Sequence, residues 1–468
     1  MGGASSPSST GKTAVSEGDG KVDTVKALGG SNSAGGRSSG LGGWQTGGAQ
    51  SGGLVEMGGT QSVGSMSSAG GRVSSGGATG QGGTTTTRGK SATTGTTSKG
   101  GAVSAVGGST AAGGSSASGG TSTVTTTATG PCDIYKAGNT ACVAAFSTVR
   151  ALYGAYTGSL YQVKKLDGST KDIGVLSPGG VADAAAQDAF CTGSGSCTIS
   201  IIYDQSGNGN HLTKAPGGSE VYGPNDDVEA IADALPIKIG GQKAYGVHVV
   251  GSTSWTATGQ VGYRNTNTKS IPKGDNPETE YMVTDGTYYN GACCFDFGNA
   301  EMKPVAGGYG TMEAIYFGSC DWWDKGTGTG PWIMADLEVG VYGWGGPTAY
   351  SDANKNGNRV NPNAISFAHP FVTALLKGNS SKATNGGPFT LKGGSAQSGT
   401  LTTLWDGAYP VGYGSPMQRQ GGIVLGIGGD NSSTARGNFF EGVIAAGYAS
   451  TATDEAVQAN IVAAGYSK

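Results

Sequence analysis

Short apolar stretches recur after residue 130, and Gly, Asn, Asp and Ser residues separate them. This rhythm is typical of antiparallel strands joined by turns, and it predicts strands at Cys197–Tyr203, Met312–Phe317, Trp332–Glu338 and Gly422–Ile427. Three stretches fit helices better: Val143–Leu152, Val181–Cys191 and Asp454–Ala464. Because strands and helices do not alternate regularly, we expect an all-β fold, an antiparallel β-sandwich with a few short helices.

One turn refines this expectation. The segment from Tyr203 to His211 follows a predicted strand, and its Asp, Asn and Gly residues suit a tight, irregular turn. It resembles a turn of concanavalin-type and laminin-G-like sandwiches, which implies a jelly roll of that kind. We expect His211 to be a structural turn residue and not a catalytic one.

Composition divides the chain near residue 130. The first part is rich in Gly, Ser, Thr and Ala and contains a single aromatic residue, Trp44, whereas all seven cysteines follow it. Such a segment cannot bury enough apolar surface to offset the entropy of ordering the chain. We therefore expect residues 1–130 to be a disordered linker or stalk and residues 131–468 to be one β-sandwich catalytic domain.

Several classes of function are disfavoured. The net charge is −3 and no basic cluster occurs, which argues against a nucleic-acid partner. No run of about 18 apolar residues predicts a membrane span. The three histidines and the cysteines have no metal-ligand spacing, and no phosphate-binding loop occurs. We expect no metal and no organic cofactor, which leaves carboxylates as the candidate catalytic groups.

The cysteines suggest disulfides and an oxidising compartment. Cys132 and Cys142 form one close pair in sequence, and Cys191 and Cys197 form another. The adjacent Cys293 and Cys294 have Cα atoms about 3.8 Å apart, below the usual disulfide range. A bond between them would be an unusual feature of the kind found at functional sites, and it would leave Cys320 unpaired. The alternative is that each pairs elsewhere, with Cys320 as the competitor.

Carboxylates cluster at two places. In the predicted strand Trp332–Glu338, Asp336 and Glu338 share a face with a Trp and a Met, and would lie roughly 7 Å apart. This suits a sugar cleft, although a solvated outer face of a sandwich explains the pattern equally well. Asp430 follows a predicted strand and the pair Gly428-Gly429, where it could be an acid/base residue or simply an Asx turn.

Tryptophans in a Gly-rich loop offer a stacking surface. Trp322 and Trp323 are adjacent, and such a loop is poorly suited to burying both indoles. One of them could instead pack on the edge of the sandwich.

Together these features resemble glycoside hydrolase family 54, the α-L-arabinofuranosidase B group. The resemblance extends from about Pro131 to Tyr466. It rests on seven blocks: Pro131–Tyr135, Gly179–Asp183, Ile202–Gly207, Asn290–Asp296, Gly330–Glu338, Leu425–Ser432 and Val457–Val462.

The resemblance implies a retaining mechanism and assigns roles to residues. Glu338 would be the nucleophile and Asp430 the acid/base. Asp336 would bind sugar hydroxyls, and Trp323, placed by its spacing, would line the pocket. The substrate would also contact a Cys293–Cys294 disulfide beneath the sugar and the backbone of Gly429.

Two departures from the family pattern stand out. Val339 follows the nucleophile where fungal members have Asn, so a side-chain hydrogen bond to the sugar is expected to be missing. Fungal members also carry a C-terminal β-trefoil arabinose-binding module, whereas this sequence stops at Lys468, just after the expected catalytic domain, and the Gly-rich tract is foreign to their pattern.

We therefore expect a secreted or extracellular, monomeric exo-α-L-arabinofuranosidase that acts on plant cell-wall polysaccharides or oligosaccharides such as arabinan and arabinoxylan. No apolar export signal is present near Met1, and the tract could serve as a tether to the cell surface. The alternatives are a non-catalytic lectin-like sandwich, an adhesin built around the stalk, and a related glycosidase such as a β-xylosidase.

Overall fold

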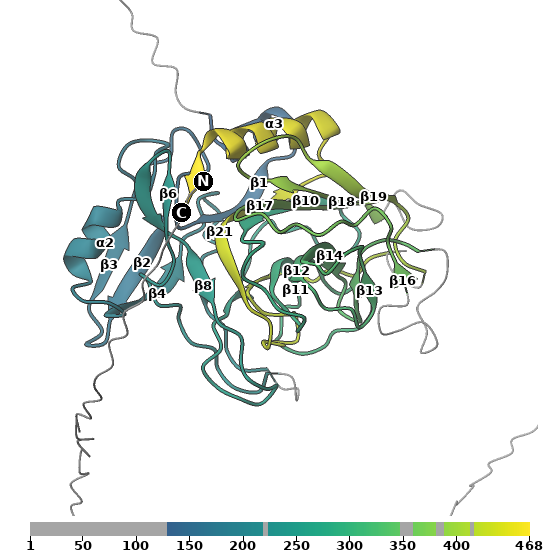
Figure 1. Cartoon of the computed structure of the whole chain (residues 1–468), viewed down its shortest axis with the longest axis horizontal. Coiled ribbons are helices and arrows are strands. Elements are labelled where there is room, and N and C mark those ends of the chain that lie inside the picture. The colour runs from purple at the N-terminus through teal and green to yellow at the C-terminus, as the bar shows by residue number, and fades with distance from the viewer. Residues whose placement is uncertain (1–128, 219–222, 347–358, 381–387, 412–415) are drawn as a thin grey trace, which may run out of the picture. The chain divides into compact units, whose positions relative to one another are not determined.

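A computed structural model describes residues 129–218, 223–346, 359–380, 388–411 and 416–468 (Figure 1). The tract expected to be disordered lies outside the described residues, apart from its last two. Within the described ranges the chain forms two large antiparallel β-sheets with three short helices, which confirms the predicted all-β sandwich. No helix in these ranges is long and apolar enough to cross a lipid bilayer.

Two large sheets contain most of the strands. In spatial order, the seven-stranded sheet contains β1 (Cys142–Ser147), β21 (Gly437–Ala446), β10 (Glu278–Thr284), β17 (Val372–Gly378), β18 (Phe389–Ser395) and β19 (Thr402–Gly407), with β8 (Val247–Val249) paired to β21. In the same order, the ten-stranded sheet contains β15 (Val341–Tyr342), β14 (Trp332–Asp336), β12 (Glu313–Gly318), β11 (Asp296–Ala300), β20 (Gly422–Leu425), β9 (Tyr263–Asn265), β5 (Leu212–Lys214), β4 (Cys197–Ile202), β2 (Tyr161–Lys165) and β3 (Thr170–Ile173).

Smaller elements complete the fold. A three-stranded sheet contains β22 (Tyr466–Ser467), β6 (Pro236–Ile239) and β7 (Gln242–Tyr245), and β13 (Asp324–Lys325) pairs in parallel with β16 (Arg359–Val360). The helices are α1 (Pro131–Ala137), α2 (Ala184–Phe190) and α3 (Thr451–Ala463).

The main core lies between the two large sheets. Phe297 and Ile333 from the ten-stranded sheet join Leu376 and Ile444 from the seven-stranded sheet in one fully buried cluster. The rings of Phe297 and Phe439 lie 5.2 Å apart across this interface. Alternate residues of each strand supply this core, as a sandwich requires.

A second apolar cluster includes residues on the other face of the seven-stranded sheet. Tyr281 on β10 and Phe440 on β21 join Tyr135 from α1, Ile461 from α3 and Tyr466 from β22. Helix α3 contacts α1, and Figure 1 shows α3 at the edge of the sandwich. Because both faces of this sheet are covered, its central strands are buried along their whole length, as on β10.

The expected helix at Val143–Leu152 is wrong. This stretch begins inside β1, which is fully buried and pairs with β21. Its alanines favour a helix in isolation, but tertiary pairing overrides that preference. The other two predicted helices correspond to α2 and α3.

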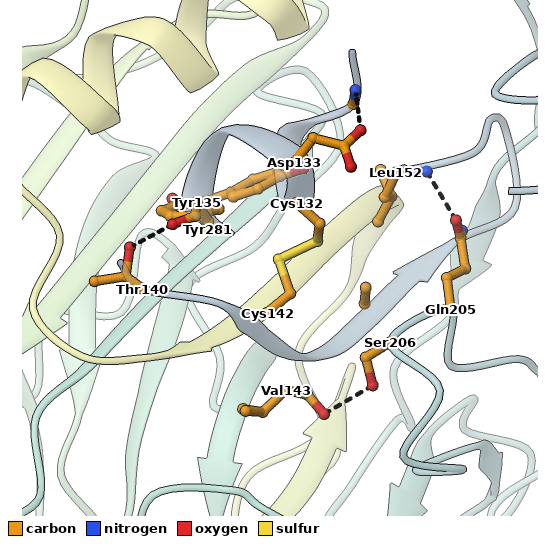
Figure 2. The surroundings of a disulfide bond; sticks show 12 residues. Cys132, Asp133, Tyr135, Thr140, Cys142, Val143, Leu152, Gln205, Ser206 and Tyr281 are labelled. Atoms are coloured by element: carbon orange, nitrogen blue, oxygen red, sulfur yellow. Dashed lines mark hydrogen bonds between the residues drawn. A yellow bond between two sulfur atoms is a disulfide. The ribbon is translucent and has the colours of Figure 1, made fainter. Parts of the chain in front are cut away.

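Helix α1 was not predicted. It begins at Pro131, and Asp133 accepts a hydrogen bond from the Gly130 N–H at 2.9 Å, so the Pro and the Asp were usable start signals. A disulfide between Cys132 and Cys142, with an S–S distance of 2.06 Å, ties α1 to β1 (Figure 2). The structure also contains the Cys191–Cys197 disulfide, between the end of α2 and β4.

The turn after β4 is organised by a buried carboxylate. Asp204 is 5% exposed and accepts backbone N–H bonds from Ala145, Ser206 and Asn210 at 2.8–3.0 Å. The Asp204 N–H itself donates to His211 Nδ1 at 3.0 Å, so His211 has a structural contact in this turn. Figure 2 shows the adjacent Ser206 hydroxyl donating to the carbonyl of Val143 on β1. Asp204 therefore joins the turn after β4, a strand of the ten-stranded sheet, to β1 at the edge of the seven-stranded sheet.

Replacing Asp204 tests this role. Asp204→Ala leaves three buried backbone donors without an acceptor, and we expect it to lower the free energy of unfolding by about 2–4 kcal/mol. Asp226→Ala, at an exposed carboxylate, is the control and should change it by less than about 0.5 kcal/mol. Urea denaturation of both variants measures the difference, and equal stability of the two would contradict the assigned role.

Candidate active site

Strand β14 places Asp336 at the end of a buried strand. Ile333 and Ala335 face the core between the sheets, whereas Trp332 and Met334 face a separate apolar cluster. This alternation follows the sequence pattern. The alternative of a solvated outer face is wrong, because every residue of β14 is buried and Asp336 is only 4% exposed.

Glu338 lies beyond the strand. The strand ends at Asp336, two residues earlier than predicted, and Glu338 adopts a φ of +77°, in the left-handed region that non-glycine residues seldom occupy. The Glu338 N–H donates to Asp336 Oδ1 at 2.9 Å, which fixes this turn. The Gly307 N–H donates to Glu338 Oε1 at 3.2 Å. Such a backbone conformation is often found where a side chain serves a function.

Two consecutive glycines allow the second carboxylate segment to approach. A Cβ on Gly428 would lie 3.2 Å from Asp430 Oδ1 and 3.4 Å from the Cβ of Cys294. A Cβ on Gly429 would lie 2.8 Å from Glu338 Oε2. A side chain at position 428 would clash with the Ser432 hydroxyl, and one at position 429 would clash with the acidic side chains, so close approach accounts for both glycines.

Asp430 makes the contact of an Asx turn and also lines a cavity. Its Oδ1 accepts the N–H of Ser432 at 2.8 Å, which is the contact of an Asx turn. The same carboxylate lines a pocket together with Asp336 and Glu338. A turn contact therefore orients a group that remains accessible to a ligand.

Adjacent cysteines form part of the pocket wall. The structure links Cys293 to Cys294, both almost fully buried, and leaves Cys320 as a buried free cysteine. Cys294 Sγ lies 3.2 Å from Asp336 Oδ2. The two sulfurs and the Asp336 carboxylate are close enough to hold a metal ion, but disulfide sulfurs are not the thiolates that bind metals well.

These groups meet in one cavity of about 330 Å³. All seven residues that the sequence proposed for catalysis or substrate binding line it. The complete lining is Trp255, Cys293, Cys294, Ala306, Trp322, Trp323, Asp336, Glu338, Val339, Gly429, Asp430 and Ser432.

Three indoles form the aromatic part of the cavity. The ring centroids of Trp322 and Trp323 lie 5.7 Å apart, and those of Trp255 and Trp322 lie 6.0 Å apart. Trp322 is 38% exposed, whereas Trp323 and Trp255 pack against the apolar cluster behind the disulfide. Trp255 was missed because it is distant in sequence from the other site residues and has no motif around it.

A cluster of buried carboxyl groups behind the cavity was also missed from the sequence alone. Burial raises the pKa of Asp296 well above its usual range, and burial together with the neighbouring Asp296 does the same for Asp336. Burial, followed by the neighbouring Glu301 and Asp336, also raises the pKa of Glu338. Carboxyl groups so close together in a low-dielectric site cannot all be ionised.

Arg264 on β9 is the cation beside this cluster. Its Nη2 donates to the carbonyls of Glu301 at 2.8 Å and Gly429 at 2.7 Å. Its charge acts on Glu301, Glu338 and Asp430, while burial lowers its own pKa. Gly429 was expected to contribute a backbone contact to the substrate, and its carbonyl accepts this bond from Arg264.

Comparisons with known proteins identify relatives of this chain. A family model for the catalytic domain of alpha-L-arabinofuranosidase B matches residues 131–467. A probable alpha-L-arabinofuranosidase B of Aspergillus terreus is 50% identical over 348 residues, covering 74% of this chain and 64% of the relative. An alpha-L-arabinofuranosidase of Hypocrea jecorina is 51% identical over 344 residues, covering 72% and 63%. The chain thus spans less than two thirds of the length of these relatives.

Solved structures show the same relationship. A glutamate-to-glutamine mutant of a GH54 α-L-arabinofuranosidase, soaked with 4-nitrophenyl α-L-arabinofuranoside, matches with a TM-score of 0.64 and 45% identity over 72% of this chain and 66% of that one. An arabinofuranosidase complexed with arabinofuranosyl-α-1,2-xylobiose matches with the same values. The extent of the family match and the identity to these relatives show that the chain belongs to glycoside hydrolase family 54, the family of the alpha-L-arabinofuranosidase B catalytic domain.

Proposed function

We propose that this protein is a retaining, exo-acting α-L-arabinofuranosidase that removes terminal arabinofuranosyl units. The observation that carries the proposal is the cavity that brings Glu338 and Asp430 together beside three tryptophans, in a chain of this family. A pair of carboxyl groups flanking one binding site is what glycoside hydrolysis needs, whereas binding alone does not require it.

The proposed reaction is a double displacement. In the first step, Glu338 attacks the anomeric carbon, the glycosidic C–O bond breaks, and Asp430 gives its proton to the leaving oxygen. In the second step, Asp430 takes a proton from water, whose oxygen attacks the anomeric carbon and releases Glu338. The configuration at the anomeric carbon is inverted twice and is therefore retained. No metal or organic cofactor takes part.

The remaining lining residues suit recognition of a pentofuranose. The Cys293–Cys294 disulfide offers a compact apolar surface, and Asp336 beside it can hold sugar hydroxyls. The indole of Trp323 gives a face for the sugar ring. Val339 also lines the cavity and cannot provide a side-chain hydrogen bond. We propose arabinan, arabinoxylan and related plant cell-wall oligosaccharides as substrates, since one related structure holds arabinofuranosyl-α-1,2-xylobiose.

A second activity is favoured by one relative. A protein of Trichoderma koningii named arabinofuranosidase/B-xylosidase is 51% identical over 344 residues. Activity on β-xylosides is therefore the second candidate for this chain.

Hydrolysis of aryl glycosides tests the proposal. We expect the protein to release 4-nitrophenol from 4-nitrophenyl α-L-arabinofuranoside faster than from the β-D-xylopyranoside. Glu338→Gln should lower kcat by at least about 10⁴-fold while keeping the fold, because an amide cannot act as the nucleophile. Wild-type protein without activity on either glycoside, while still binding arabinan, would indicate a lectin-like sandwich instead.

Asp430 should show the behaviour of an acid/base residue. Asp430→Ala is expected to lose most activity on natural arabinosides but less kcat/KM on the aryl substrate, because nitrophenolate leaves with little protonation. Azide replaces the water that Asp430 would activate, so it should raise turnover and give an arabinosyl azide of retained configuration. An equal loss on both substrates without azide rescue would mean that Asp430 is only a turn residue.

We further propose that residues 1–130 are a linker or stalk to the catalytic domain 131–468, and that the protein acts as a secreted monomer. The tract's composition and the Cys132–Cys142 and Cys191–Cys197 disulfides support this assignment. A protein beginning at Thr129 should match the full chain in kcat/KM on the aryl arabinofuranoside and in melting temperature. A large loss of either in the shorter protein would contradict a linker role.

A further inference from the structure

Glu301 is a buried carboxyl group that the double displacement does not use. It follows β11 and is 1% exposed. Its Oε1 accepts a hydrogen bond from the Thr311 hydroxyl. Its Oε2 is buried, and no N–H or O–H group of the described residues donates to it. A buried carboxyl oxygen without a donor is costly when the group is charged, but not when that oxygen carries a proton.

The unpaired oxygen lies beside the proposed nucleophile. A Cβ on Gly429 would collide with Glu301 Oε2 and would lie 2.8 Å from Glu338 Oε2, so both oxygens reach the same side of Gly429. The two carboxyl groups therefore come close together. Two carboxylate oxygens can only repel each other, so this contact requires a proton between them.

The surroundings indicate which residue keeps the proton. Glu338 borders the open cavity, and its Oε1 already accepts the Gly307 N–H, an interaction that favours its ionised form. Burial raises the pKa of both groups, but Glu338 borders the open cavity whereas Glu301 is 1% exposed, so a charge on Glu338 is the better solvated of the two. The Arg264 guanidinium, held on the Glu301 carbonyl, compensates one negative charge in this region.

We propose that Glu301 is a positioning residue that stays protonated and donates a hydrogen bond from Oε2 to the carboxylate of Glu338. The bond stabilises the ionised nucleophile and fixes its orientation toward the cavity. This inference rests on the proposed function, because it assigns the partner of the nucleophile in that reaction.

Other ionisable groups act on the same pair. Asp336 and Asp430 face Glu338 from β14 and from the segment after β20, and Asp296 on β11 backs Asp336. Arg264 is the positively charged group that acts on both glutamates, and it also lies near Asp227. Substitutions at position 301 leave all of these groups in place, so a change in pH dependence reports on residue 301.

The sign of the shift distinguishes the two protonation patterns. If Glu301 donates a proton, losing the donor destabilises ionised Glu338 and moves the acidic limb of the kcat/KM profile to higher pH. If Glu301 were instead the ionised member, neutralising it would remove a repelling charge and move that limb to lower pH.

The experiment is the pH profile of kcat/KM on 4-nitrophenyl α-L-arabinofuranoside for Glu301→Gln and Glu301→Met. The amide of Gln is a weaker donor, so the acidic limb of the Glu301→Gln profile should move to higher pH by less than about one unit. Met has no donor, so the acidic limb of the Glu301→Met profile should move to higher pH by about one to two units, as expected for a lost hydrogen bond to a charged group. Thr311→Val removes the hydroxyl that orients the Glu301 carboxyl group and should give a smaller shift in the same direction.

Glu280→Gln is the matched control. Glu280 on β10 is equally buried and also has an unpaired Oε2, but it belongs to the group around Glu278, Glu313 and Arg419 and does not line the cavity. Its acidic limb should not move. A downward shift in Glu301→Gln, or a uniform loss at every pH with unmoved limbs in the 301 and 311 variants, would overturn the inference. Inactive wild-type protein would instead refute the proposed function.

Discussion

The structure depends on a constraint of electrostatics: several carboxyl groups are buried together beside one guanidinium. Asp296 lies near Asp336, Glu301 lies near Glu338, and Arg264 is the cation that acts on this region. In a low-dielectric site these groups cannot all be charged, so they must share protons. The distribution of those protons determines which carboxylate is available to attack a sugar and which ones can only donate.

The sandwich supplies the rigidity that this arrangement needs. Strands β11, β12 and β14 are neighbours in the ten-stranded sheet, and Gly298, Ala314 and Asp336 are in lateral register across them. On β11, Gly298 is therefore level with Asp336, and Asp296 lies two residues before Gly298. Core packing between the sheets fixes the strands, and the loops that follow β14 and β20 bring Glu338 and Asp430 to the cavity.

Local sequence patterns predicted much of this site and part of the fold. Alternation in Trp332–Asp336 identified a strand with one core face, and the Gly-Gly-Asp block identified Asp430. The pattern could not predict that β1 is a strand, because its partner β21 lies about 300 residues away and its alanines suit a helix. Arg264 and Glu301 were missed for the same reason, since each becomes meaningful only through contacts between distant segments.

The central claim is that Glu338 is the ionised carboxylate that bonds to the sugar. It is tested most directly by mass spectrometry of Asp430→Ala protein quenched during turnover of an aryl arabinofuranoside. In this variant the covalent intermediate forms readily but breaks down slowly. We predict one arabinosyl group per chain, located by peptide mapping on Glu338. An arabinosyl group on Asp336, Glu301 or any other carboxylate, with Glu338 unmodified, would contradict the account.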